Sequence, residues 1–260
     1  MVYAPFNLAN KVALVTGGNG GIGFGMAEAM AQAGAAIVIW GTNEEKNHAA
    51  ETAIKKYGNK VHVQKVDVSD EKSVTVAMTD AVTKMGRLDA VFANAGIGSY
   101  ARSFLEMTTE QYRKVLAVNL DGVFFTMREA ARHMHDRATK GDKGGSLVGV
   151  ASLAAIEGAA RNEHYAATKG AVISMMKSVA VEFARDGVRA NSILPGWIAT
   201  DMTAGAQSSP AFSEKVIPRV PARRWGQPAD FGGIAVYLAS DASAYHSGDT
   251  FVIDGGYAIF

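Results

Sequence analysis

The chain has 260 residues, 48% of them hydrophobic, and can bury one large α/β core as a single domain, residues 1–260. Its 26 basic and 25 acidic residues leave a formal net charge of +1, which predicts no nucleic-acid partner. The absence of cysteine excludes disulfides, thiolate chemistry and cysteine-ligated metal, and we expect no metal site. Residues 1–10 lack a signal-peptide pattern and no apolar run reaches membrane length, so we expect a cytoplasmic protein without a membrane partner.

Short apolar runs typical of strands alternate along the chain with longer segments typical of helices. We expect strands near residues 11–16, 36–40, 61–66, 89–93, 146–151, 188–194 and 250–253. We expect helices near residues 21–33, 43–57, 70–85, 108–135, 162–185 and 228–239. This alternation predicts a Rossmann fold, a doubly wound parallel sheet of about seven strands with helices on both faces. The long irregular stretch 197–228 is then a substrate lid.

A glycine-rich turn joins the first expected strand to the first expected helix. It reads Thr16-Gly17-Gly18-Asn19-Gly20-Gly21-Ile22-Gly23. Glycine lets the backbone approach a pyrophosphate closely, and the helix N-terminus offers unpaired N–H groups to the phosphates. The order strand, glycine turn, helix therefore predicts a dinucleotide site.

Tyr165 and Lys169 lie one helical turn apart in the expected helix 162–185. A phenol is a poor acid–base group at neutral pH, since its unperturbed pKa is about 10. An ammonium four residues on shares a helix face with the phenol and favours the phenolate, so the pair is a candidate acid–base catalyst. His164 precedes Tyr165 but points about 100° away on a helix, and we interpret it as a packing or rim residue.

With these motifs in place, the chain resembles the short-chain dehydrogenase/reductases over nearly its whole length. The glycine turn is similar to the family's cofactor turn, and Tyr165-x3-Lys169 to its catalytic pair. Further matching segments follow in the family's order: Asp67 in Val66-Asp67-Val68, Asn94-Ala95-Gly96, Asn119 in Val118-Asn119-Leu120, Ser152 in Val150-Ala151-Ser152, and Pro195-Gly196-Trp197-Ile198-Ala199-Thr200. The chain departs from the pattern at Ala93, where the family's turn has an asparagine.

The resemblance implies an NAD(P)-dependent oxidoreductase that interconverts a ketone and a secondary alcohol by hydride transfer. Tyr165 would be the general acid or base, and Lys169 would lower its pKa and hydrogen-bond the nicotinamide ribose. Ser152 would donate to the substrate oxygen, and Asn119 would hold a water that links Lys169 to solvent. Family precedent also implies transfer from the pro-S face of the nicotinamide.

The resemblance also implies the residues that contact each ligand. The cofactor would be bound by Gly17, Asn19, Gly20, Gly21, Ile22, Gly23, Thr42, Asn43, Asp67, Val68, Asn94, Ala95, Gly96, Tyr165, Lys169, Pro195, Gly196, Ile198 and Thr200. The small-molecule substrate, a ketone or secondary alcohol, would meet Ser152, Ala154, Asn162 and Trp197.

The end of the second strand favours NADP over NAD. An NAD-specific site places an acid there, which accepts from the ribose hydroxyls and repels a 2′-phosphate. This strand instead ends in Gly41-Thr42-Asn43, with no acid before Glu44. Thr42 and Asn43 can donate to a phosphate, and Lys46 could reach back to it, so we expect NADP, with NAD also possible.

A nucleotide-binding regulator without turnover is the alternative function, because fold does not fix function. Epimerase and dehydratase relatives fit less well, since they carry a longer C-terminal substrate domain and a differently spaced glycine turn.

A homotetramer is expected from small residues on the helices 108–135 and 162–185, with a second interface at the apolar tail 257–260. The small residues are Ala130, Ala131, Ala166, Ala167, Gly170 and Ala171.

Overall fold

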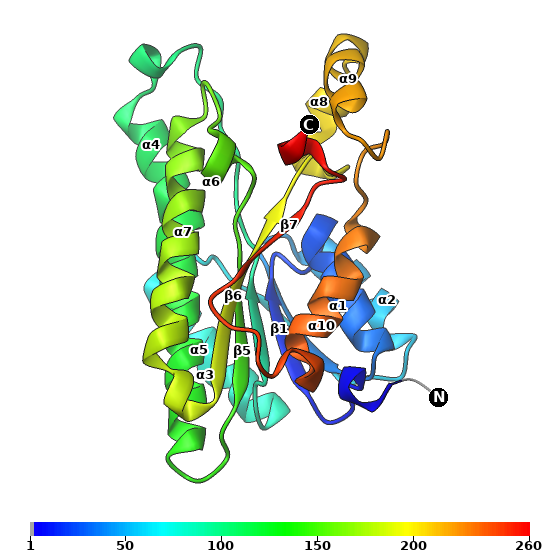
Figure 1. Ribbon diagram of the computed structural model, residues 1–260. Helices are drawn as coiled ribbons and strands as arrows, with labels where there is room; N and C mark the ends of the chain where they lie inside the picture. The colour runs from blue at the N-terminus through cyan, green and yellow to red at the C-terminus, as the bar shows by residue number, and fades with distance from the viewer. Residues whose placement is uncertain (1–2) are drawn as a thin grey trace.

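The computed structural model describes residues 3–260, which form one sheet of seven parallel strands. The strands lie in the order β3-β2-β1-β4-β5-β6-β7 (Figure 1). The predicted Rossmann fold and all seven predicted strands are confirmed. Their bounds are β1 (Val12–Thr16), β2 (Ala36–Gly41), β3 (Val61–Lys65), β4 (Ala90–Ala93), β5 (Gly145–Val150), β6 (Val188–Pro195) and β7 (Thr250–Ile253).

Helices cover both faces of the sheet, which is why the central strands are apolar on both sides. The helices α1 (Gly21–Gln32), α2 (Glu44–Lys55) and α10 (Gly232–Ala239) lie on one face (Figure 1). The opposite face is covered by α3 (Glu71–Met85), α5 (Gly122–Ala138) and α7 (Glu163–Glu182). Successive strand residues alternate between the two cores, so that Leu14 packs in one and Val15 in the other.

The helix expected over 108–135 is interrupted. It consists of α4 (Thr109–Leu116), one turn of π-helix, η3 (Ala117–Asp121), and then α5. A capping box at Thr108 and Gln111 fixes its start. Sequence periodicity does not reveal a single π-turn, because one extra residue shifts the pattern only slightly; such turns occur often at functional sites.

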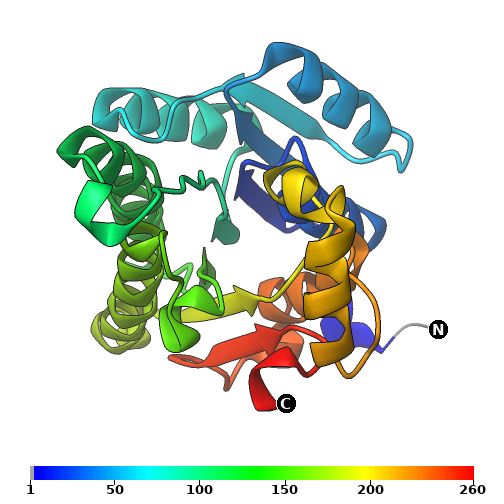
Figure 2. The same cartoon turned by 90° about the horizontal axis from the view of Figure 1, so that it is seen from above.

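The stretch 197–228 is more regular than expected, and its prediction as irregular chain was wrong. It holds η5 (Asp201–Thr203), α8 (Ala204–Gln207), α9 (Pro210–Val216) and η6 (Ile217–Arg219). These short helices stand over the carboxyl edge of the sheet, as the view from above shows (Figure 2). Trp197 anchors them, because its ring packs edge-on against Phe212 at 4.9 Å and against Trp225 at 6.1 Å between centroids.

The remaining helical segments are short, and α6 (Ala154–Glu157), which follows β5, was not predicted. The other 3₁₀ turns are η1 (Ala4–Phe6), η2 (Phe104–Glu106), η4 (Ala184–Asp186), η7 (Pro228–Phe231), η8 (Asp241–Ser243) and η9 (Tyr257–Ile259). Over residues 3–260, no helix combines the length and the apolarity needed to cross a membrane.

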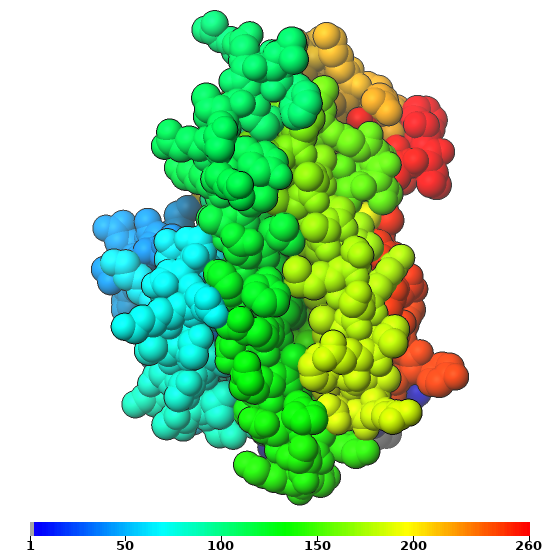
Figure 3. All heavy atoms as spheres, turned by 90° about the vertical axis from the view of Figure 1, so that its left-hand side faces the viewer, coloured from blue at the N-terminus to red at the C-terminus, as the bar shows by residue number. Residues whose placement is uncertain are grey.

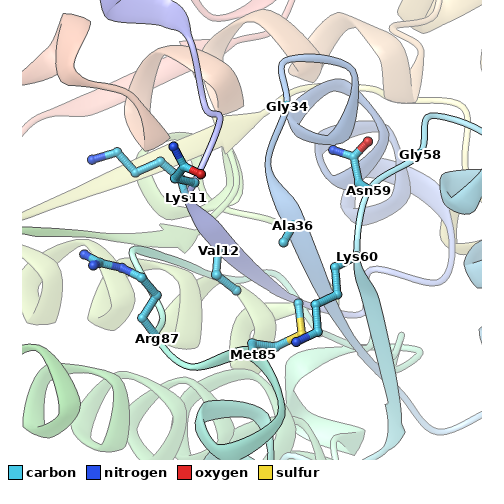
Figure 4. A pocket seen from close by; sticks show the side chains of 10 residues that line it. Lys11, Val12, Gly34, Ala36, Gly58, Asn59, Lys60, Met85 and Arg87 are labelled. Atoms are coloured by element: carbon cyan, nitrogen blue, oxygen red, sulfur yellow. The ribbon is translucent and has the colours of Figure 1, made fainter.

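The strand order reverses between β1 and β4, and this topology places a ligand crevice at the carboxyl ends of those strands. A separate hollow of about 450 Å³ lies at the opposite edge, where β1 and β2 begin (Figure 4). Lys11, Lys60 and Arg87 line it, and each of these cations is already bound to an acidic side chain or a backbone carbonyl. The candidate functional site therefore lies at the carboxyl edge of the sheet.

Candidate active site

Side-chain hydrogen bonds tie the carboxyl ends of β1 and β4 together. The hydroxyl of Thr16 accepts from the backbone N–H groups of Asn94 at 3.0 Å and of Ala95 at 2.9 Å. In return, the Asn94 amide donates to the carbonyl of Thr16 at 3.0 Å. The glycine turn and the turn 94–96 are thereby fixed against each other. The role of Thr16 was not predicted, although a hydroxyl at the end of the strand was visible in the sequence.

The glycine turn fits a dinucleotide because three of its positions favour glycine and a fourth is open to solvent. Gly17 and Gly21 have φ values of +62° and +52°, in the left-handed region that glycine favours. A Cβ on Gly23 would collide with the carbonyl oxygen of Gly17, whereas a Cβ on Gly20 would meet nothing within 4 Å. The turn therefore packs tightly at Gly23 and is open at Gly20, at the N-terminus of α1, where a pyrophosphate would be stabilised.

A second network joins the glycine turn to the end of β2. The Asn19 amide donates to Oδ1 of Asn47 at 2.7 Å, and the Asn47 amide donates to the carbonyl of Gly41 at 3.0 Å. A Cβ on Gly41 would collide with both asparagine side chains, which leaves no room there for the acid typical of NAD-specific sites. Asn47 was not predicted, because a polar residue on an exposed-looking helix carries no signal of this contact.

The predicted contacts of the adenosine half lie around the ends of β2 and β3. Thr42 and Asn43 are exposed, and Asn43 caps α2 by accepting from the backbone of Lys46 at 2.9 Å. Asp67 accepts from the backbone N–H of Ser69 at 3.0 Å and from its hydroxyl at 2.7 Å. Val68 is buried next to the first residue of α5. The Lys46 ammonium does not reach back along α2, since it binds Asp201 at 2.6 Å instead.

Tyr165 and Ser152 are brought together by α7 and the end of β5. Burial raises the pKa of the Tyr165 phenol above its ordinary value, and the nearby phenol of Tyr100 adds to the rise. The nearby hydroxyl of Ser152 opposes that rise without cancelling it. Ser152 also accepts from the backbone N–H of Ala154 at 3.2 Å, which orients its hydroxyl.

Lys169 and Tyr165 lie on the same face of α7, as the spacing predicted. The Lys169 Nζ lies 5.5 Å from the centroid of the Tyr165 ring and donates to the carbonyl of Val150 at 2.8 Å. The side chain is buried in the core, and burial lowers the pKa of Lys169 to about 8. In the cofactor-free protein, burial is the main influence on the phenol pKa, and the expected lowering by Lys169 together with a positively charged cofactor stays a prediction.

Asn119 is fully buried in the π-turn η3, and its side chain has two partners. Its Oδ1 accepts from the backbone N–H of Ile97 at 2.8 Å, and its amide donates to the carbonyl of Ile97 at 2.9 Å. A Cβ built on Gly96 would lie 3.3 Å from Asn119 Oδ1 and 3.6 Å from Lys169 Nζ. Asn119 therefore holds the turn 96–97 next to Lys169, and its expected hold on a water stays a prediction.

The segment after β6 closes the crevice from the other side. Gly196 passes so close to Asp254 that a Cβ would collide with it. Ile198 is buried and pairs with Gly226 in an isolated bridge. A Cβ on Gly21 would lie 3.2 Å from the Thr200 side chain, so Thr200 lies directly over the glycine turn.

The predicted substrate residues differ in how they are placed. Asn162 is 5% exposed, and its Oδ1 has no hydrogen-bond partner among the described residues, which leaves an acceptor for a ligand or water. Trp197 packs into the aromatic cluster of the lid, so its contact with a substrate stays a prediction. His164 is buried as a packing residue, with both ring nitrogens unpaired within residues 3–260. Residues 3–260 hold no cluster of three or more potential metal ligands.

Comparison with known proteins agrees with this architecture. A family model described as "Enoyl-(Acyl carrier protein) reductase" matches residues 17–258. The chain is 35% identical over 253 residues to an L-rhamnose 1-dehydrogenase (NAD(P)(+)) of Azotobacter vinelandii, covering 96% of this chain and 97% of the relative. It is 34% identical over 257 residues to a 2-dehydro-3-deoxy-D-gluconate 5-dehydrogenase of Dickeya dadantii, covering 99% of each.

Solved structures show the same family. A short-chain type dehydrogenase/reductase from Mycobacterium marinum superposes with a TM-score of 0.92 at 32% identity, covering 98% of each chain. A gluconate 5-dehydrogenase from Burkholderia cenocepacia, solved with NADP and tartrate, superposes with a TM-score of 0.91 at 34% identity, covering 98% of this chain and 97% of that one. The chain belongs to the short-chain dehydrogenase/reductases. It is an NAD(P)-dependent oxidoreductase that acts on a CH–OH or C=O group.

The buried ammonium gives a prediction about stability. Below pH 8, folding must desolvate a charged Lys169, whereas above pH 10.5 the lysine is neutral in both states. Lys169→Met should therefore raise the free energy of unfolding at pH 7 by about 1–3 kcal/mol, and the gain should shrink as the pH rises through 8 toward 10. Urea unfolding at pH 7 and pH 9.5 measures this.

Lys56→Met is the matched control, because Lys56 is exposed at the end of α2 and also loses one positive charge. A gain for Lys169→Met that was equal at both pH values, or a loss of stability at pH 7, would contradict the cost assigned to burying the ammonium.

Proposed function

We propose that the protein uses NADP(H) to interconvert a ketone and a secondary alcohol on a small polyhydroxylated molecule, a sugar or sugar acid. One observation carries the proposal: Ser152, Tyr165 and Lys169 meet at the ends of β5 and α7, beside the turn 96–97 and across from the open glycine turn. The bound nicotinamide would supply and accept the hydride, which leaves orientation and proton transfer to the protein.

Tyr165 would move the proton. Because burial raises its pKa, the phenol is protonated at neutral pH, which is the form that donates to a carbonyl oxygen during reduction. Ser152, whose hydroxyl lies near the Tyr165 phenol, would donate to the same oxygen and stabilise its developing negative charge. Lys169, with its pKa near 8, could both give and take a proton near pH 7–8, and so could resupply the phenol during turnover.

The substrate class is proposed from the relatives and from one polar group. The relatives named above act on L-rhamnose and on a dehydrodeoxygluconate, both of which carry several hydroxyl groups. The unpaired Oδ1 of Asn162 can accept from such a hydroxyl. Together with Ser152 and Ala154, Asn162 would line the substrate site under the lid 197–228, with Trp197 at its base.

The principal test of this function is Tyr165→Phe, which keeps the ring and removes the proton. We expect kcat to fall at least 100-fold, because a positioned general acid contributes at least that much, while the Kd for NADPH changes by less than about threefold. Nicotinamide absorbance at 340 nm reports turnover on a panel of sugars and sugar acids, and NADPH fluorescence reports binding.

Tyr112→Phe is the control, since Tyr112 lies on α4 and is 39% exposed. Retention of more than about a tenth of wild-type activity in Tyr165→Phe would assign the proton transfer to another group. A wild-type protein that bound NADPH but turned over no carbonyl or alcohol would favour the regulator instead.

NADP preference is proposed from the end of β2. Gly41 leaves no space for an acid, and the exposed Thr42 and Asn43 can donate to a 2′-phosphate. The solved gluconate 5-dehydrogenase noted above contains NADP. We expect kcat/KM to be higher with NADPH than with NADH under identical conditions, with measurable use of both. A higher value with NADH would overturn the preference.

We also propose a homotetramer in the cytoplasm. Figure 3 shows the face formed by α4, α5 and α7, which would pack against a second copy. Ala130 and Ala131 are buried beneath that face, so their expected place in the interface was wrong. Exposed Phe124 and Val181 take their place on α5 and α7, and the exposed tail ending in Phe260 would form the second interface.

Light scattering at micromolar concentration tests the assembly. The expected mass is four times the 27.4 kDa of one chain. Charged substitutions on the helical face, such as Val181→Glu, should reduce the mass to that of a dimer held by the tail. A wild-type protein that scattered as a monomer would contradict both interfaces.

A further inference from the structure

An ion pair spans the nucleotide crevice at its adenosine end. Lys46 lies in the first turn of α2, and Asp201 is the first residue of η5, at the base of the lid. Their Nζ and Oδ2 atoms are 2.6 Å apart. Both side chains are open to solvent, with 53% of Lys46 and 88% of Asp201 exposed, so a ligand can reach either partner.

The Lys46–Asp201 pair lies between the end of β2 and the glycine turn, the two segments expected to bind the nucleotide. On one side, Asn43 caps α2 directly after β2, and it is followed within one turn by Lys46. On the other side, Thr200 lies over Gly21 of the glycine turn, and Asp201 comes next in the chain. The end of β2 is the position at which Rossmann folds distinguish a ribose hydroxyl from a ribose phosphate.

From this placement we infer that Asp201 sets the cofactor preference, because it competes with the 2′-phosphate of NADP for Lys46. This inference rests on the proposed use of NADP. A 2′-phosphate beside Thr42 and Asn43 carries a charge of about −1.5 to −2 and draws the Lys46 ammonium toward it. Asp201 holds that ammonium in the free protein and so withholds it from the phosphate, which gives a weaker form of the discrimination that an acid at the end of β2 would supply.

The Lys46–Asp201 pair is weak enough to discriminate only partially between NADP and NAD. An exposed ion pair contributes at most about 1 kcal/mol, so a phosphate dianion can displace it at a small cost. With NAD, which has only hydroxyls at this position, the Lys46–Asp201 contact stays intact. This turn also carries Glu44 and Glu45; Glu44 pairs with Lys65 at 3.3 Å, and within residues 3–260 neither acid pairs with Lys46. The expected result is use of both cofactors with a moderate preference for NADP.

The test uses two nucleotides that differ only in the 2′-phosphate, 2′,5′-ADP and 5′-AMP, titrated by calorimetry into the full-length protein. We expect Asp201→Asn to tighten the Kd of 2′,5′-ADP by about 3–5-fold, because the Lys46 ammonium no longer has to leave Asp201 to bind the phosphate, and to leave that of 5′-AMP within twofold. Lys46→Gln should weaken 2′,5′-ADP by a similar factor. In the double variant the effect of Asp201→Asn should vanish, because its target is gone.

Glu51→Gln is the matched control. It removes one negative charge from the pair with Lys55 on the same helix, five residues beyond Lys46, and should change neither Kd by more than twofold. The inference is wrong if Asp201→Asn leaves 2′,5′-ADP unchanged, tightens both nucleotides equally, or still tightens 2′,5′-ADP in the Lys46→Gln background. The readout is binding, so these outcomes are separate from a failure of catalysis, which Tyr165→Phe reports.

Discussion

The site depends on the tie between the carboxyl ends of β1 and β4. The Thr16 hydroxyl and the Asn94 amide exchange three hydrogen bonds of 2.9–3.0 Å with the backbones of the two turns. This contact holds the glycine turn, where the phosphates are expected, against the turn 94–96. Asn119 then holds Ile97, and through it places this turn beside Lys169. The nucleotide half and the catalytic half are thus connected by hydrogen bonds between short side chains and the backbones of the two turns.

The fold was predictable because its signals are local and repeated. Most strands are short apolar runs, and Gly17, Gly21 and Gly23 of the first turn are favoured by positive φ values or by a close approach to the backbone. The order of the family motifs identified the family. The catalytic residues were located by the same motifs, and the structure places both Ser152 and Lys169 near Tyr165.

Several features that the sequence did not predict depend on contacts between distant segments. Asn47 joins the glycine turn to β2 across 28 residues, and Lys46 meets Asp201 across 155. No local pattern marks either pair. The π-turn η3 and helix α6 are local, but each is too short to produce a recognisable periodicity. Spacing on a helix shows that Tyr165 and Lys169 share a face, but it does not show that the Val150 carbonyl accepts from the ammonium or that burial shifts both pKa values.

The proposed function requires that a hydride is transferred between nicotinamide and a substrate carbon in this crevice. NADPH deuterated at the pro-S position of C4, incubated with sugars, sugar acids, cyclic and aryl ketones and acyl thioesters, tests it directly. Mass spectrometry should find one deuterium on the carbinol carbon of at least one product, and none when the pro-R position is labelled. Tight binding of NADPH with no labelled product from any class would contradict the claim and favour a protein that binds the nucleotide without turnover.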